Sequence, residues 1–144
     1  MLISRSADKL EATKKAIQSE VRSSGAQIQI RTLAVDFTRV DIYDQVKAFL
    51  DAGRTRSIYI LVNNVGNAPS SLDYFLSTEH RLDPGINQKL ITVNAIATTK
   101  MIELVLPSMV ENGRGLLINV GSMSSRHIVP MISLYSATKV QYKG

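Results

Sequence analysis

Short apolar runs alternate with amphipathic segments along almost the whole sequence, and this alternation limits the fold more than any other feature. "IYILV" at 58–62 and "GLLINV" at 115–120 are continuous apolar runs of strand length. Such runs are typical of strands buried on both faces of a parallel sheet. The longer segments between them place apolar residues every three or four positions, as covering helices do. The pattern predicts an α/β fold, a parallel sheet with helices on both faces.

The first third of the sequence predicts a helix followed by a strand. Ser6 is a suitable N-cap for a helix with an apolar face, and Gly25 is placed to end it. Residues 28–37, "IQIRTLAVDF", are rich in β-branched and apolar types. We therefore expect a buried strand that ends near Asp36.

Two further helices are expected. Thr38 and Asp41 have the spacing of a capping box, so a second helix should start there and end at Gly53. After a predicted surface loop at 68–85, a long helix should run from Ile86 to about Val110, unless Pro107 kinks it or ends it early. Its predicted inward positions are Leu90, Val93, Ala97, Met101, Leu104 and Met109. A last helix should begin near Leu134.

Composition excludes several classes of function. The chain has 144 residues, which is enough for one domain and too few for two, and its formal charge of +5 is scattered rather than gathered in a basic tract. With only 6% aromatic residues and no RNA-binding motif, we expect no nucleic-acid partner. There is no cysteine, and His80 and His127 lack ligand spacing, so no metal site is expected. No apolar run approaches the roughly 20 residues of a membrane span.

Tyr135 and Lys139 lie at positions i and i+4, on one face of the predicted last helix. A tyrosine ordinarily titrates near pH ~10, and a nearby ammonium favours its phenolate. The pair could therefore donate and accept a proton near neutral pH. The alternative interpretation is a packed aromatic residue beside a solvated lysine, because this spacing also occurs by chance.

Other polar residues stand at positions that suit a ligand site. Ser122 follows the apolar run at 115–120, and "NNVG" at 63–66 directly follows the run at 58–62. Ligands of open α/β sheets bind outside these carboxyl ends of the strands. Asn94 falls inside the long predicted helix, where asparagine is a poor helix former and needs a local reason.

Six motifs together resemble the short-chain dehydrogenase/reductase superfamily. In order they are "LISRSADKL", "VDFT", "ILVNNVG", "VNAIAT", "LLINVGS" and "YSATK". NNVG in place of the more usual NNAG, and "DFT" followed by "DIY", resemble the microsomal branch of 17β-hydroxysteroid dehydrogenases and very-long-chain 3-oxoacyl-CoA reductases. The resemblance implies a doubly wound, Rossmann-like parallel sheet. Residues 1–144 would form one partial NAD(P)-binding domain of it.

The resemblance implies roles for four residues. Tyr135 would be the general acid that protonates a carbonyl oxygen as hydride arrives from the nicotinamide. Lys139 would bind the nicotinamide ribose and favour the phenolate of Tyr135. Ser122 would hydrogen-bond the substrate oxygen, and Asn94 would hold a water that links Lys139 to solvent. His127 is interpreted as a loop residue near the substrate mouth, and Ser124 and Ser125 as polar groups of the loop, because Ser122 has the better spacing.

The resemblance also implies an NADP(H) site. Arg5 would accommodate the 2′-phosphate, since an arginine suits that group where NAD-specific relatives carry an acid; a solvated arginine at a helix entrance is the alternative. Asp36 would hydrogen-bond the adenine. Asn63, Asn64 and Gly66 would line the adenosine and steady the central sheet.

The sequence departs from the superfamily pattern at both ends. The first strand, the TGxxxGxG loop and the first helix, whose N-terminus receives the pyrophosphate, have no counterpart here, and nor do the segments after Lys139. In the strand order 3-2-1-4-5-6 the missing first strand lies between the second and fourth. We therefore expect two unpaired interior edges, weak cofactor binding at most, and a parent protein that is the enzyme.

The sequence thus supports two functional hypotheses. The first is an NADP(H)-dependent carbonyl reductase or hydroxysteroid dehydrogenase, in steroid metabolism or fatty acid elongation, acting on a steroid or a 3-oxoacyl-CoA lipid. The alternative is a catalytically inactive truncated form or interaction fragment of such an enzyme. By resemblance the full-length parent would be membrane-associated in the endoplasmic reticulum and could be a homo-oligomer packed through its long helices. The chain itself carries no evident targeting segment.

Overall fold

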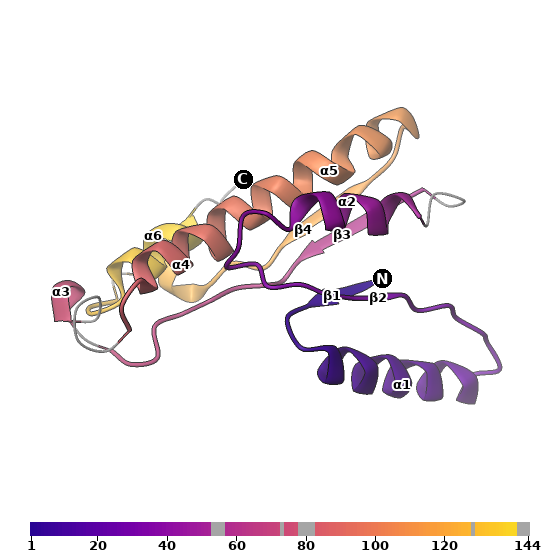
Figure 1. The fold of residues 1–144 in the computed structure, drawn as a ribbon, viewed down its shortest axis with the longest axis horizontal. Helices are drawn as coiled ribbons and strands as arrows, with labels where there is room; N and C mark the ends of the chain where they lie inside the picture. Colours follow the sequence, from indigo (N-terminus) through magenta and orange to yellow (C-terminus); the bar gives the residue numbers. More distant parts are fainter. Residues whose placement is uncertain (53–56, 73, 78–82, 128, 141–144) are drawn as a thin grey trace. The chain divides into compact units, whose positions relative to one another are not determined.

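In a computed structural model of the chain, the structure describes residues 1–52, 57–72, 74–77, 83–127 and 129–140. The chain divides into two compact units, Met1–Gly53 and Arg54–Gly144, and each is described by itself (Figure 1). This division does not test the single partial domain expected over 1–144, which stays a prediction.

The first unit is a parallel strand pair with a covering helix. Its elements are β1 (Leu2–Ser4), α1 (Ala7–Ser23), β2 (Thr32–Ala34) and α2 (Tyr43–Asp51). β1 and β2 pair in parallel, and α1 connects them and packs against both (Figure 1). As predicted, the Ser6 hydroxyl caps α1 by accepting from the Lys9 N–H at 3.3 Å. Gly25 follows the helix with a left-handed φ of +78°.

The predicted capping box at 38–41 is wrong. α2 begins at Tyr43, and Ile42 at its N-cap makes no side-chain capping bond. The two predicted partners are engaged elsewhere: Thr38 donates its backbone N–H to Asp36 Oδ1 at 3.0 Å, and Asp41 accepts from Arg39 Nε at 2.9 Å. β2 is also shorter than the predicted strand, and Gly53, expected to end α2, lies outside the described residues.

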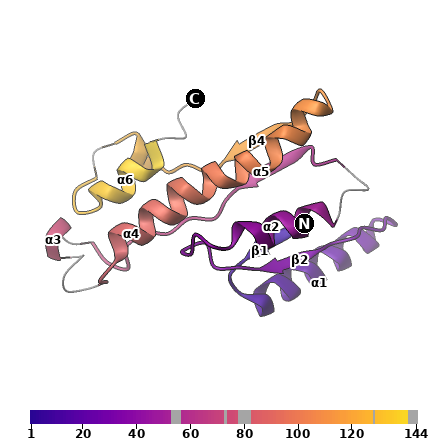
Figure 2. The ribbon, with the colours of Figure 1, turned by 45° about the horizontal axis from the view of Figure 1, so that its top comes forward.

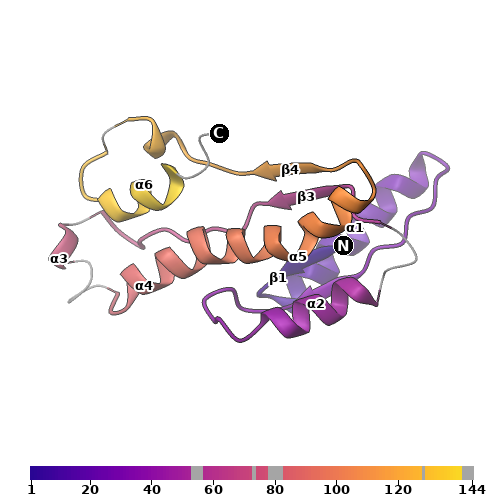
Figure 3. The ribbon, with the colours of Figure 1, turned by 90° about the horizontal axis from the view of Figure 1, so that it is seen from above.

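The second unit pairs β3 (Ile60–Asn63) with β4 (Leu116–Asn119) in parallel, from Ile60 opposite Leu116 to Asn63 opposite Asn119. A long helical rod runs beside this pair (Figure 3). It consists of α4 (Ile86–Ile91), a π-helical segment (Thr92–Ile96) and α5 (Ala97–Glu111). The short α3 (Phe75–Ser77), a 3-10 turn (Met123–Ser125) and α6 (Ser133–Val140) complete the unit.

The long helix has a different irregularity from the one predicted. Pro107 lies inside α5 and does not end it; the departure from α geometry is the π-helical segment Thr92–Ile96. Among the predicted inward residues Leu104 is only half-buried, and Val105 is buried in its place. The other predicted inward residues are buried: Leu90, Val93, Ala97, Met101 and Met109.

The strand pairing confirms the parallel α/β prediction, and one detail of burial corrects it. In the described residues the strands form two separate parallel pairs, β1 with β2 and β3 with β4. The expected burial of both sheet faces is wrong for the second pair, because Ile60 is 59% and Val62 is 52% exposed. Together with Leu116 and Ile118, also exposed, they form what we call the apolar face of β3–β4.

The helical rod Ile86–Glu111 is long and apolar enough to cross a membrane by length and composition. This is weak evidence, because core helices of globular proteins meet the same criterion. Here the two halves of the rod have protein neighbours: α4 and the π-helical segment pack against α6, and α5 packs against β3 (Figures 2 and 3).

Candidate active site

Lys139 is a buried lysine on α6, with 5% of its surface exposed. Its ammonium donates to the carbonyl oxygen of Val120, just after β4, at 3.3 Å. Burial lowers the pKa of Lys139 from its ordinary value, because desolvation penalises the charged form. Burying a lysine destabilises the fold, and a buried lysine with a shifted pKa is characteristic of functional sites.

Asn94 is the centre of a polar cluster within the π-helical segment, and its side chain is fully buried. Its Oδ1 accepts from the Asn67 backbone N–H at 2.8 Å. Its Nδ2 donates to the Asn67 carbonyl oxygen at 2.9 Å and to the Thr138 hydroxyl at 3.0 Å. Asn94 thereby joins the long helix, the loop after β3 and α6, which is the local reason for an asparagine at this position.

Gly66 completes this cluster because it leaves room for Lys139. A Cβ at Gly66 would lie 3.0 Å from Lys139 Nζ and 3.5 Å from Asn94 Oδ1. The backbone of the NNVG turn therefore approaches the buried ammonium as closely as a residue without a side chain allows. We call Gly66, Asn67, Asn94, Thr138 and Lys139 the buried polar cluster, after its three buried members Asn94, Thr138 and Lys139.

Ser122 stands at the start of the 3-10 turn, where its side-chain oxygen accepts from the Ser124 N–H at 3.2 Å. The two hydroxyl oxygens of Ser122 and Ser124 are also hydrogen-bonded, at 2.9 Å. Ser124 is buried, so it is more than the loop polar group that the sequence predicted. Ser125, the last residue of the 3-10 turn, donates to the Ser122 carbonyl oxygen at 2.7 Å.

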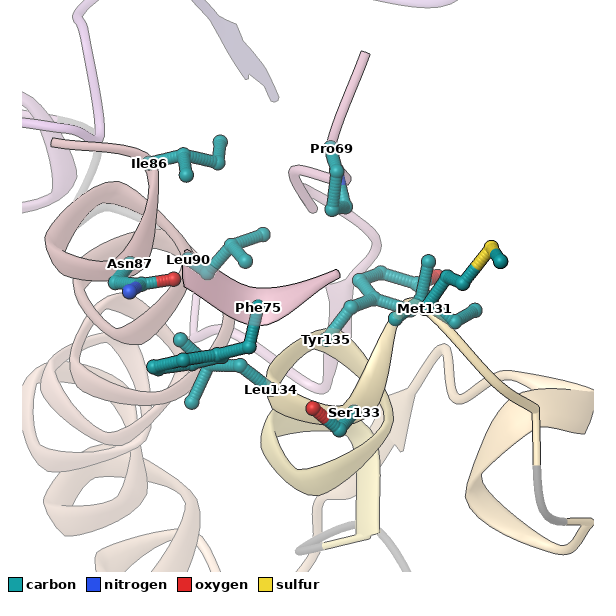
Figure 4. A pocket seen from close by; sticks show the side chains of 10 residues that line it. Pro69, Phe75, Ile86, Asn87, Leu90, Met131, Ser133, Leu134 and Tyr135 are labelled. Carbon is teal, nitrogen blue, oxygen red and sulfur yellow. The ribbon is translucent and has the colours of Figure 1, made fainter. Parts of the chain in front are cut away.

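Tyr135 is half-buried on α6 and lines a small, mostly apolar pocket (Figure 4). Met131, beside it in the pocket lining, has a left-handed φ of 68°. The lining comes from two loops, α3, α4 and α6: Pro69, Phe75, Ile86, Asn87, Leu90, Met131, Ile132, Ser133, Leu134 and Tyr135.

The two asparagines of NNVG have separate surroundings. Asn63 Nδ2 donates to Asn119 Oδ1 at 2.9 Å, which ties β3 to β4 by their side chains as well as their backbones. Asn64 donates its backbone N–H to Val62 O at 3.1 Å in a tight turn. Asn63 thus steadies the strand pair.

Arg5 and Asp36 belong to the first unit, where they follow β1 and β2 at the same end of the strand pair. The Thr38 backbone N–H holds the pKa of Asp36 below its ordinary value, and the positive charges of Arg5 and Arg39 act in the same direction. Arg5 is exposed. Both side chains are thus accessible at the carboxyl end of parallel strands, where ligands bind in open α/β folds.

A family model described as short chain dehydrogenase matches residues 1–144. The chain belongs to the short-chain dehydrogenase family. The resemblance seen in the motifs is confirmed, and the chain is a member of an oxidoreductase family with an α/β, Rossmann-like fold.

Relatives within the short-chain dehydrogenase family agree with the branch expected from the motifs. The chain is 46% identical over 139 residues to the very-long-chain 3-oxoacyl-CoA reductase of Bos taurus, covering 96% of this chain and 41% of that protein. It is 40% identical over 140 residues to 17-beta-hydroxysteroid dehydrogenase type 3 of Mus musculus, covering 96% of this chain and 42% of that protein. The chain therefore spans about two fifths of the length of these curated relatives.

A solved structure of the short-chain dehydrogenase family has the same fold. The short-chain dehydrogenase of Sphingobium yanoikuyae, in complex with NADPH, superposes with a TM-score of 0.75 at 29% identity. The match covers 96% of this chain and 50% of that one.

The structure of the chain brings some of the sequence-predicted residues together. Gly66, Asn94 and Lys139 meet in the buried polar cluster, and Tyr135 stands on the same helix as Lys139. Sequence reasoning missed Thr138, although it lies inside the quoted motif "YSATK". Among the described residues no group of three or more His, Cys, Asp or Glu could hold a metal ion; His80 lies outside them.

Proposed function

We propose that the chain is part of an NADP(H)-dependent carbonyl reductase that acts on a 3-oxoacyl-CoA lipid. The observation that supports this most directly is the meeting of Gly66, Asn94 and the buried Lys139 ammonium in one cluster. The relative named very-long-chain 3-oxoacyl-CoA reductase, at 46% identity, supports the substrate class.

The residues present fit a nicotinamide dinucleotide. The missing side chain at Gly66 allows close backbone approach beside Lys139 Nζ, and Lys139 is proposed to hold the ribose. The exposed Arg5 guanidinium suits a 2′-phosphate, and the Asp36 carboxylate can accept from the adenine amine. Asn63 and Asn64 are proposed to line the adenosine side. The cofactor, when bound, supplies the hydride.

The protein's own residues are proposed to supply orientation and the proton. Tyr135 donates its hydroxyl proton to the substrate carbonyl oxygen and acts as general acid, or as general base in the reverse direction. The Ser122 hydroxyl donates a hydrogen bond to the same oxygen. Asn94 is proposed to support a water between Lys139 and solvent.

The pocket beside Tyr135 suits the apolar part of such a substrate. Phe75, Leu90 and Leu134 contribute hydrocarbon surface to it, and Asn87 contributes one amide (Figure 4). A steroid ketone is the second candidate substrate, supported by the 40% identity to 17-beta-hydroxysteroid dehydrogenase type 3. The endoplasmic reticulum, membrane association and a homo-oligomer remain proposals for the whole protein.

Binding of NADPH tests the cofactor proposal. Fluorescence titration would compare the 144-residue chain with the same chain preceded by a family-type first strand, TGxxxGxG loop and helix. We expect saturable binding by the extended protein and weak or no binding by the 144 residues alone, because a helix N-terminus that receives the pyrophosphate is supplied only in the former. Failure of both proteins to bind would contradict the proposal.

Turnover of two carbonyl substrates then separates the functional candidates. The extended protein is assayed by NADPH oxidation with a 3-oxoacyl-CoA and with a 17-ketosteroid, and Tyr135→Phe is the matched variant. We expect faster turnover of the thioester and a loss of about 10²-fold or more with the variant, in the range given by general acid catalysis. Bound NADPH without turnover of either substrate would favour the catalytically inactive alternative.

A further inference from the structure

We propose that Thr138 is a positioning residue: its hydroxyl fixes the orientation of the Asn94 carboxamide and, through it, the Gly66–Asn67 backbone against Lys139. The inference rests on the proposed function for its catalytic meaning, although the hydrogen-bond linkage can be tested without activity. Thr138 is buried and directly precedes Lys139 on α6.

The hydrogen bonds of Thr138 determine which end of the Asn94 carboxamide faces α6. Its hydroxyl donates to the Tyr135 carbonyl oxygen at 2.8 Å, and its oxygen accepts from Asn94 Nδ2 at 3.0 Å. A hydroxyl has a single hydrogen, and once that hydrogen is donated only acceptor positions remain. Thr138 therefore requires the amide nitrogen of Asn94, rather than its oxygen, on the α6 side.

The Asn67 backbone imposes the same orientation from the opposite side. Its N–H faces Asn94 Oδ1 at 2.8 Å, and its carbonyl oxygen faces Asn94 Nδ2 at 2.9 Å. A flipped carboxamide would set donor against donor and acceptor against acceptor at both positions. Both Nδ2 hydrogens are used in this arrangement, one for Asn67 and one for Thr138.

The chain of contacts ends at Lys139. Asn67 follows Gly66, whose Cβ position lies 3.0 Å from Lys139 Nζ, so a shift of this backbone by a few tenths of an ångström would press on the ammonium or withdraw from it. In a buried site the amide lacking its Thr138 partner would also seek another acceptor, since an unpaired buried donor destabilises the fold. Thr138 thus acts on Lys139 from two sides, through α6 and through the loop after β3.

A purely structural role makes different predictions. Hydroxyl donation to a backbone carbonyl three or four residues earlier is common in helices. Thr99 is such a case: it is exposed and donates to Ala95 O at 3.1 Å. Thr99→Val is therefore the matched control for Thr138→Val, and Thr138→Ser is the conservative variant that keeps the hydroxyl.

The linkage is measured first by NMR on the 144-residue chain. In the unchanged chain both Asn94 side-chain amide hydrogens and the Asn67 backbone N–H should exchange slowly with solvent. Thr138→Val should speed exchange at all three hydrogens and shift the Lys139 side-chain resonances, whereas Thr138→Ser and Thr99→Val should leave them in place. Rapid exchange of the Asn94 hydrogens in the unchanged chain would overturn the proposal without any variant.

Turnover of the extended protein tests the catalytic consequence. We expect Thr138→Val to lower kcat about tenfold, less than the roughly 10²-fold that a 1 Å misplacement can cost. Thr138→Ser keeps the hydroxyl and should therefore hold kcat within about twofold of the unchanged protein, a smaller change than the loss of one hydrogen bond would cause. Equal loss with valine and serine would overturn the positioning role. An inactive unchanged protein would instead count against the proposed function, and the exchange experiment would decide the linkage alone.

Discussion

The Ser122 hydroxyl is held by two groups of Ser124: its oxygen accepts from the Ser124 backbone N–H, and the two hydroxyls share a hydrogen bond in which either can donate. When the Ser124 hydroxyl donates, the hydrogen of Ser122 is left for a substrate oxygen. Ser124 is buried, so the arrangement is shielded from competing water. Ser124 is therefore an orienting neighbour for the proposed site.

We expect Ser124→Ala to lower kcat of the extended protein about fivefold, the factor that corresponds to about 1 kcal/mol for one hydrogen bond. Steady-state NADPH oxidation measures it. Ser125→Ala is the control, because Ser125 bonds to the Ser122 carbonyl oxygen and not to its hydroxyl; its kcat should stay nearly unchanged. A larger loss with Ser125→Ala than with Ser124→Ala would contradict the orienting role.

Asp36 makes the stability of the first unit depend on pH, and the direction of its pKa shift fixes the sign of that dependence. The Thr38 N–H, assisted by the charges of Arg5 and Arg39, lowers the pKa of Asp36 in the folded chain. A carboxyl with a lowered folded pKa stabilises the fold fully above its unfolded pKa of about 3.9, and this stabilisation is lost as pH falls through the folded pKa.

Asp36→Asn should therefore lower the free energy of unfolding at neutral pH, and this deficit should shrink at about pH 2, because the contribution of the carboxylate is lost as pH falls through its lowered folded pKa. Asparagine keeps the oxygen that accepts from Thr38, so the comparison isolates the charge. Urea denaturation followed by circular dichroism at both pH values measures the difference. A deficit of the same size at both pH values would show that the charge is not responsible.

At the scale of elements, the π-helical segment Thr92–Ile96 joins the helix to the loop after β3. Asn94 satisfies both backbone groups of Asn67 from within this segment. A helix with a widened turn at such a point is frequent at functional sites. The segment therefore depends on a tertiary contact and not on its local sequence.

We expect Asn94→Ala to lower the free energy of unfolding by about 2–4 kcal/mol, because it removes a fully buried side chain and the hydrogen bonds that it makes to the N–H and carbonyl of the half-buried Asn67. Hydrogen exchange should rise at Asn64–Asn67. Glu103→Ala, an exposed change on α5, should cost no more than about 0.5 kcal/mol. Denaturant unfolding measures both changes. Equal effects of the two variants would contradict a stabilising role for the hydrogen bonds between Asn94 and Asn67.

The elements that the sequence predicted well are those set by local pattern. The apolar spacing and the Ser6 cap located α1, and the rod from Ile86 onward followed from its periodicity. The capping box at Thr38 failed because Asp36 and Arg39 compete for the same groups. The π-helical segment could not be predicted, since its partner Asn67 lies 27 residues from Asn94.

The same distinction applies to the candidate site. Spacing and resemblance singled out Ser122, Tyr135 and Lys139, because their order along the chain is the signal. Thr138 was missed and Ser124 was set aside as a loop residue, because threonine and serine are ordinary in helices and loops. Only the folded arrangement reveals that each hydroxyl faces another site residue.

At the scale of the whole molecule, all four residues of the apolar face of β3–β4 are exposed. Paired in register, Ile60 lies beside Leu116 and Val62 beside Ile118. Contiguous exposed apolar surface next to strand edges favours association.

We expect the 144-residue chain to self-associate with rising concentration and Ile118→Lys to weaken that association, because a charge interrupts the apolar face. Sedimentation at several concentrations measures it. Val40→Lys adds the same charge at an exposed position of the first unit and should change little. A chain that stays monomeric throughout would contradict the expectation.

The widened turn in the long helix also sets the phase between its two halves. α4 and the π-helical segment face α6, whereas α5 faces β3. In a regular α-helix each residue adds about 100° of rotation, so one extra residue there would turn Met101, Val105 and Met109 by about that angle relative to Leu90. The i→i+5 turn at 92–96 holds one more residue than an α turn. It therefore absorbs an extra residue within one turn while the two halves of the helix keep their separate partners.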